Sequence, residues 1–160
     1  MTVFSTAEES KKLAGKHLRS VGNLIDQIDI DAIGRVFERL QVARDDGMTI
    51  YIAGNGGSAA MASHVAVDFT KAAGIRAINF NEADLITCFA NDYGYERWVE
   101  KALEAYSDPG DLVILISSSG KSPNILNGAR QAKAMDLSLV TVSGFSVDNP
   151  LRKLGDLNLW

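Results

Sequence analysis

Two loops rich in glycine and serine hold the residue types that bind phosphate. The first, residues 54–58 (GNGGS), follows an apolar run and directly precedes a helical pattern. Glycine lets a ligand approach the backbone closely, and a helix start offers free amides and the positive end of the helix dipole. The second loop, residues 117–122, carries four serines, and Pro123 after it suits the first turn of a helix. Both loops therefore predict an anion site at the carboxyl end of a strand.

These loops also have other interpretations. Glycine-rich strand-to-helix turns and serine-capped turns occur without any ligand. A dinucleotide fold is a second alternative, because Gly54, Gly56 and Ala59 satisfy the G-x-G-x-x-G/A pattern and Glu82 follows the next predicted strand. Glu82 lies farther beyond Gly54 than the roughly 20 residues typical of that fold, which also leaves the serine loop unexplained. Two such loops in one sheet favour a phosphate site.

His64 and Asp68 place an imidazole and a carboxylate on the helix predicted after the first loop. Residues four apart lie on the same side of a helix. Moving a proton between adjacent carbons of a sugar requires a carboxylate base and a donor or metal at the developing oxyanion. The same spacing also suits a local side-chain pair that binds nothing. The pair alone therefore does not indicate a metal-binding or acid–base role, and the two neighbouring loops are needed to favour one.

In order and spacing, these segments resemble the phosphoheptose isomerases of the sugar isomerase (SIS) superfamily. The resemblance spans about residues 31–160 and is carried by residues 53–58, His64 with Asp68, residues 91–94 and residues 116–124. It implies a flavodoxin-like fold, a homotetramer with sites at subunit junctions, and conversion of sedoheptulose 7-phosphate to D-glycero-D-manno-heptose 7-phosphate for heptose and surface polysaccharide biosynthesis. The alternative from another class is a non-catalytic SIS module that binds a sugar phosphate or a protein partner in a regulatory role.

The resemblance also implies roles for single residues. Substrate contacts are implied for Asn55, Gly56, Gly57, Ser58, Asp68, Asn91 and Asp92, and phosphate contacts for Ser117, Ser118, Ser119 and Ser122. His64 occupies the position of a zinc ligand. Asp68 occupies that of a glutamate which is both a zinc ligand and the acid–base residue, so zinc is the implied cofactor. The family's other zinc ligands, a glutamine and a histidine, belong to a helix beyond position 160.

Alternating apolar runs and helical patterns predict the elements that position these residues. We expect one domain over 1–160, with an N-terminal helical segment, 1–47, and an α/β core, 48–160, without a C-terminal helix. The core is predicted to be a three-layer, doubly wound, five-stranded parallel sheet. The predicted strands are 49–53, 76–80, 112–116, 137–142 and 156–160. The predicted helices are 7–27, 31–44, 59–72, 85–90, 96–106 and 123–135, with a short one starting at Pro150.

The N-terminal helix carries two patterns of its own. Ser5 with Glu8, and Thr6 with Glu9, both match the capping-box spacing at its start. Its apolar residues form one stripe, which covers either its own sheet or a second copy of the chain. The members of this stripe are Leu18, Val21, Ile25 and Ile28.

Composition narrows the class of protein. The net charge of -4, from 16 Lys and Arg against 20 Asp and Glu, gives no general field for nucleic acid or an anionic membrane. No apolar run approaches the roughly 18 residues of a membrane span, and residues 1–10 lack a signal-peptide pattern. The single cysteine, Cys88, agrees with a reducing cytoplasm and is expected to be a buried apolar side chain. Tyr93, Tyr95 and Trp98 are expected to pack in the core or an interface.

Overall fold

The computed structural model describes residues 6–160. The chain separates into two compact units between Ile30 and Asp31, so the interpretation as one domain stays a prediction. The helices are α1 (Ala7–Ile25), α2 (Ile30–Asp45), α3 (Gly57–Lys71), α4 (Ala83–Tyr93), α5 (Trp98–Tyr106) and α6 (Pro123–Ala134). The strands are β1 (Ile50–Gly54), β2 (Ala77–Asn79), β3 (Leu112–Ser117), β4 (Ser138–Ser143) and β5 (Leu157–Leu159).

Helix α1 begins with a capping box made by Thr6 and Glu9. The Thr6 hydroxyl accepts from the Glu9 amide at 3.2 Å, and the Glu9 carboxylate accepts from the Thr6 amide at 3.1 Å. This confirms one of the two predicted capping pairs, while Ser5 of the other lies outside the described residues. No residue of α1 is buried, and whether its apolar stripe covers its own sheet or another copy stays a prediction.

All neighbouring strands of the sheet are parallel, in the order β2-β1-β3-β4-β5. From β1 the chain moves outward to β2, then returns to β3 on the other side of β1 and continues to β5. The strand order therefore reverses between β1 and β3, as in flavodoxin-like sheets and unlike the usual dinucleotide-binding order. In folds of this kind ligands bind at the carboxyl ends of the strands, at the reversal point.

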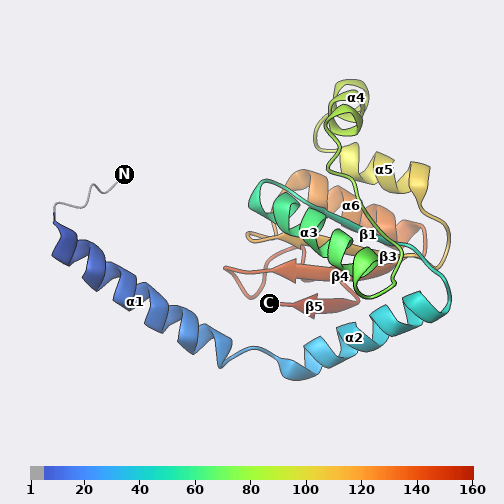
Figure 1. The fold of residues 1–160 in the computed structure, drawn as a ribbon. Helices are drawn as coiled ribbons and strands as arrows, with labels where there is room; N and C mark the ends of the chain where they lie inside the picture. Colours follow the sequence, from blue (N-terminus) through green and yellow to red (C-terminus); the bar gives the residue numbers. More distant parts are fainter. Residues whose placement is uncertain (1–5) are drawn as a thin grey trace. The chain divides into compact units, whose positions relative to one another are not determined.

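The sheet is buried on both faces because alternate residues of each central strand point to opposite sides. Ile50 and Ile52 join a core with Val36 of α2 and Ala62 of α3, whereas Tyr51 packs on the side of α5 and α6. Two helical layers therefore enclose the sheet, as predicted, and Figure 1 shows α5 and α6 together on one side.

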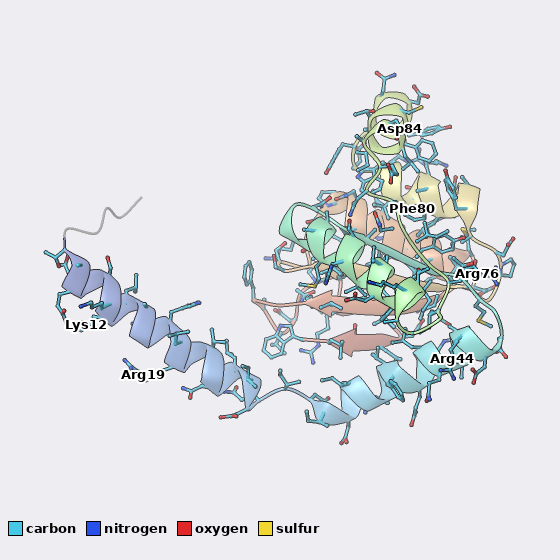
Figure 2. The ribbon with its side chains drawn as sticks, in the orientation of Figure 1. Lys12, Arg19, Arg44, Arg76, Phe80 and Asp84 are labelled. Atoms are coloured by element: carbon cyan, nitrogen blue, oxygen red, sulfur yellow. The ribbon has the colours of Figure 1, made fainter. Side chains whose placement is uncertain are left out.

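The Tyr51 side of the sheet also holds the aromatic part of the core. Phe80, labelled in Figure 2, stacks on Tyr51 with their ring centroids 5.3 Å apart. Trp98 at the start of α5 is 1% exposed in the same core, as predicted. Val99 of α5 and Ile125 of α6 belong to the same core, so the first turns of both helices pack onto this face.

Three details differ from the sequence prediction. Helix α4 extends to Tyr93, which places Asn91 and Asp92 in its last turn. Cys88 is exposed rather than buried, because Leu85, Ile86 and Phe89 form the side of α4 that packs on the core. The segment after Pro150 forms turns instead of a helix and ends at Gly155, although the Asn149 side chain caps it by accepting from the Arg152 amide at 3.0 Å.

Among the described residues, no helix combines the length and apolar character that crossing a membrane requires.

Candidate functional site

The two predicted phosphate loops lie side by side. Gly54 at the end of β1 is in register with Ile116 of the neighbouring strand β3, so the chain leaves both strands at the same edge of the sheet. Gly54 also allows α3 to start close to β1, because a Cβ at this position would lie 2.7 Å from backbone atoms of Ser58. The structure thus brings residues 54–58 and 117–122 together at the reversal of strand order.

A pair of side-chain amides joins the two loops. Asn55 Nδ2 donates to Asn124 Oδ1, and Asn124 Nδ2 donates to Asn55 Oδ1, both at 2.9 Å. Asn55 Oδ1 also accepts from the Tyr95 hydroxyl at 3.2 Å. Asn55 is therefore held from α6 and from the segment between α4 and α5 at once.

The first loop leaves the start of α3 open to an anion. Gly56 is the N-cap residue and has φ +54°, a backbone conformation that favours glycine. Within residues 6–160 no side chain caps this helix start, and the Ser58 amide donates to the Asn55 carbonyl at 3.0 Å. Amides at such a helix start are suited to bind a phosphate group.

In the second loop, backbone carbonyl groups are hydrogen-bonded to backbone amides elsewhere in the protein. The Ser118 carbonyl accepts from the Gly144 amide and the Gly120 carbonyl accepts from the Leu151 amide. Gly120 itself has φ +61°. Because these carbonyls are already bonded, the loop offers an anion its hydroxyls and the start of α6.

The serines of this loop differ in burial. Ser117 is buried and its Oγ lies 3.3 Å from Ser122 Oγ, across the loop. Ser119 Oγ accepts from the Lys121 amide at 3.3 Å and so helps to close the turn. Lys121 is exposed and adds a positive charge to the rim of the loop. Hydroxyl groups and one peripheral lysine suit the binding of a phosphate group.

His64 and Asp68 form a pair on α3, as predicted, but away from the two loops. His64 Nε2 lies 3.4 Å from Asp68 Oδ2, and the two side chains are 80% and 59% exposed. At about 1.5 Å per residue, they lie roughly 10 and 16 Å along the helix axis from Gly57. One chain therefore does not bring this pair to the phosphate loops.

Asn91 and Asp92 lie on the exposed side of α4. Asn91 Nδ2 donates to Asp92 Oδ1 at 2.9 Å, and Cys88 Sγ lies 3.9 Å from Asp92 Oδ2. The Asn91 amide orients the Asp92 carboxylate. Asn91 and Asp92 are connected to the site through the backbone, because Tyr95, three residues after Asp92, bonds to Asn55.

The start of α5 is fixed by an ion pair directly after Tyr95. Arg97 Nη2 lies 2.6 Å from Glu100 Oε1, and Arg97 Nε donates to the other carboxylate oxygen at 3.2 Å. These hydrogen bonds from Arg97 hold the pKa of Glu100 below its usual value. The fixed helix start limits the movement of the segment that carries Tyr95.

The described residues do not form a complete metal site. A catalytic zinc ion takes three protein ligands, and no group of three His, Cys, Asp or Glu side chains suited to a metal occurs within residues 6–160. His64 and Asp68 offer two donors at 3.4 Å from each other. As a donor set in one chain, this pair does not fit a closed zinc site.

Sequence reasoning missed the roles of Asn124 and Tyr95. Asn124 follows Pro123 in the predicted phosphate segment, but its partner Asn55 is far away in the sequence. Tyr95 was expected to pack in the core or an interface. Its ring is exposed, so it is not in the core, and its hydroxyl bonds to Asn55, while packing in an interface stays a prediction. The signal that could have identified Asn124 is a polar side chain in the first turn of a helix, directly after a serine loop.

Comparison with known proteins identifies the family. The family model described as SIS domain matches residues 16–144 of the chain. This chain belongs to the SIS domain family. Within it, the chain is similar to phosphoheptose isomerases. It is 34% identical over 142 residues to one from Burkholderia pseudomallei, and this match covers 85% of this chain and 72% of that protein.

Two further comparisons agree with this assignment. The phosphoheptose isomerase of Fusobacterium nucleatum is 39% identical over 115 residues, covering 69% of this SIS chain and 59% of that relative's length. The solved structure of a phosphoheptose isomerase from Francisella tularensis superposes with a TM-score of 0.87 at 20% identity, over 96% of this chain and 84% of that one. The second comparison shows that the fold is shared.

Proposed function

We propose that this SIS domain isomerises sedoheptulose 7-phosphate to D-glycero-D-manno-heptose 7-phosphate, a step in heptose and surface polysaccharide synthesis. The observation that carries the proposal is the pair of loops joined through Asn55 and Asn124 at the reversal of strand order. Relatives named phosphoheptose isomerases, at 34–39% identity, support the choice of substrate. A cytoplasmic location is part of the proposal and agrees with a single unpaired cysteine.

In this proposal the serine loop and the start of α6 hold the phosphate of the substrate. Ser117, Ser118, Ser119 and Ser122 would donate hydroxyl hydrogen bonds, and the amides of the helix start would add the favourable end of the dipole. Binding at the phosphate anchors the far end of the sugar. Asn55 and the start of α3 then contact the carbons nearer the reacting end.

Asp68 is our candidate for the base that moves the proton. A carboxylate takes a proton from the carbon beside the carbonyl group, which gives an enediol, and returns a proton to the neighbouring carbon. The ketose thereby becomes an aldose, with no change in oxidation state overall. His64, 3.4 Å from Asp68, would orient the carboxylate or donate to the developing oxyanion.

The distance between Asp68 and the loops supports an active site shared between copies of the chain. His64 and Asp68 lie on an exposed face of α3, with the exposed apolar side chains of Met61 and Val67 beside them. Apolar side chains that gather on a surface beside polar groups are a feature of protein–protein interfaces. In a homotetramer, α3 of one copy would bring His64 and Asp68 to the phosphate loops of another.

Zinc stays a proposal in this account. His64 and Asp68 would be two of its ligands, and when bound the ion would polarise the carbonyl group of the substrate. Within residues 6–160 of one chain, no third His, Cys, Asp or Glu side chain joins them in a group suited to a metal. The roles given above to the serine loop and to Asn55 do not depend on the ion.

The test is to follow sedoheptulose 7-phosphate by 13C NMR with purified protein, with and without added zinc. The proposal predicts a new aldose C1 signal that grows with protein concentration. Binding of the sugar phosphate without any aldose under either condition would favour the non-catalytic SIS module instead. Size-exclusion chromatography with light scattering on the same sample tests the tetramer.

A further inference from the structure

Asn124 is a buried amide that no contact with the substrate explains. It is 1% exposed, at the second position of α6, in a part of the helix whose neighbours Ile125 and Ala129 belong to the core. Burying a side-chain amide removes its hydrogen bonds to water, and this destabilises the fold unless protein groups replace them. Both polar atoms of Asn124 bond to Asn55 and thereby avoid that cost.

The same pair determines what Asn55 presents to a ligand. An amide oxygen has two lone pairs, and Asn55 Oδ1 already accepts from Asn124 and from Tyr95. The amide nitrogen has two protons, of which one goes to Asn124. The group that Asn55 has left to offer is one N–H donor, which suits a carbonyl or hydroxyl oxygen of a sugar.

Three segments of the proposed site therefore meet at the Asn55 side chain. Asn124 belongs to the helix that follows the phosphate loop, Asn55 to the loop after β1, and Tyr95 to the segment that follows Asn91 and Asp92. A shift of any one segment breaks or lengthens a hydrogen bond to another. Asn55 is thus the point at which the phosphate end and the sugar end are mechanically connected.

We propose that Asn124 is a positioning residue: through its paired hydrogen bonds it fixes the Asn55 amide as a donor to the sugar and couples that donor to the phosphate loop. This inference rests on the proposed function for the identity of the sugar phosphate. It adds to that function a residue that acts through Asn55 without touching the substrate.

The experiment compares Asn124→Ala and Asn124→Asp with the wild-type protein. Ser138→Ala is the control, because it removes a hydroxyl that accepts from Arg39 at the opposite end of the sheet, where β4 begins. Four quantities are measured: kcat and KM for sedoheptulose 7-phosphate, its Kd, the Kd of inorganic phosphate, and stability to urea. NMR exchange of the Asn55 side-chain amide protons reports the pair without turnover.

In Asn124→Ala we expect kcat to fall about tenfold or more, because Asn55 loses both of its hydrogen bonds to Asn124 and its donor is no longer fixed. The Kd of inorganic phosphate should stay within about threefold of the wild-type value, since the serine loop is intact. The sugar phosphate should lose its affinity advantage over inorganic phosphate. Both side-chain protons of Asn55 should exchange quickly.

Asn124→Asp gives a pH dependence that a merely structural role would not produce. The carboxylate can accept from Asn55 but cannot donate to Asn55 Oδ1, so activity should fall at neutral pH. Protonation restores a donor, because a carboxylic acid pairs with an amide through two hydrogen bonds. The ratio of variant to wild-type kcat should therefore rise as pH falls.

The inference is overturned if kcat of Asn124→Ala matches that of Ser138→Ala, or if kcat and phosphate affinity fall in equal proportion. The latter result would mean that Asn124 only shapes the phosphate loop. If the wild-type protein shows no turnover, the proposed function fails, and the Asn55 exchange rates with the two Kd values still decide the role of Asn124.

Discussion

Replacing Gly120 by alanine should destabilise the protein much more than the same replacement at Gly74. Both glycines are left-handed, with φ +61° and +65°, so alanine at either position costs about 1–2 kcal/mol of backbone strain. At Gly74 a Cβ would meet nothing within 4 Å. At Gly120 it would lie 2.0 Å from Asn149 Oδ1 and 2.4 Å from Asn149 Cγ. The two substitutions thus differ in one contact.

The loss of stability caused by this clash can be estimated from the hydrogen bonds of Asn149. Its side chain is buried and makes three hydrogen bonds, donating to Ser143 Oγ and the Ser146 carbonyl and accepting from the Arg152 amide. Moving it away from a new methyl group breaks these bonds, at about 1 kcal/mol each. We therefore expect a loss of about 4–5 kcal/mol for Gly120→Ala and about 1–2 kcal/mol for Gly74→Ala.

Urea unfolding of the wild-type protein and both variants, followed by circular dichroism, measures the difference. The slope of the transition should be the same for all three, so that midpoints report stability alone. Titration with inorganic phosphate should show weaker binding for Gly120→Ala only, since Gly74 is outside the site. Equal losses of stability in the two variants would refute the conclusion that a Cβ at position 120 displaces the hydrogen-bonded Asn149 side chain.

Two further predictions concern single side chains near the site. Ser122→Ala should raise the Kd of inorganic phosphate about five- to tenfold by isothermal titration, because one hydroxyl donor is lost, and an unchanged Kd would remove Ser122 from the site. Glu100→Gln should reduce stability to urea at neutral pH by a small amount, and the difference from wild type should vanish in acid. The sign follows from the lowered pKa of Glu100: its pairing with Arg97 stabilises the protein above the usual glutamate pKa and is lost as pH falls through the lowered one. A difference that persisted in acid would contradict this cause.

The strands could be predicted from the sequence because central parallel strands are buried on both faces. Such strands give nearly continuous apolar runs, and the observed bounds of β1, β3 and β4 differ from the prediction by one residue at each end at most. The ends of the helices were harder to predict from the sequence. Nothing in the apolar pattern showed that α4 would continue to Tyr93, because its last turn is exposed and its polar residues also suit a loop.

The phosphate loops were predictable because glycine, serine and a following helix start are local features. The pairing of Asn55 with Asn124 was not, since it depends on β1 and β3 being neighbours and on a reversal of strand order between them. The separation of Asp68 from the loops has the same origin. A four-residue spacing shows that His64 and Asp68 share a helix face, but only the fold shows where along the sheet that face lies.

The most direct test of the proposed isomerase is to run the reaction in D2O with wild-type protein and with Asp68→Asn, and to follow the sugar phosphate by NMR. We predict that the wild-type protein forms the aldose and that deuterium appears at its C2, because the proton on the carboxylate exchanges with solvent before it is returned. Asp68→Asn should be slower by about 100-fold or more, while its Kd for inorganic phosphate is unchanged. Aldose formation at the wild-type rate by Asp68→Asn, or none by a wild-type protein that binds the sugar phosphate, would contradict the account.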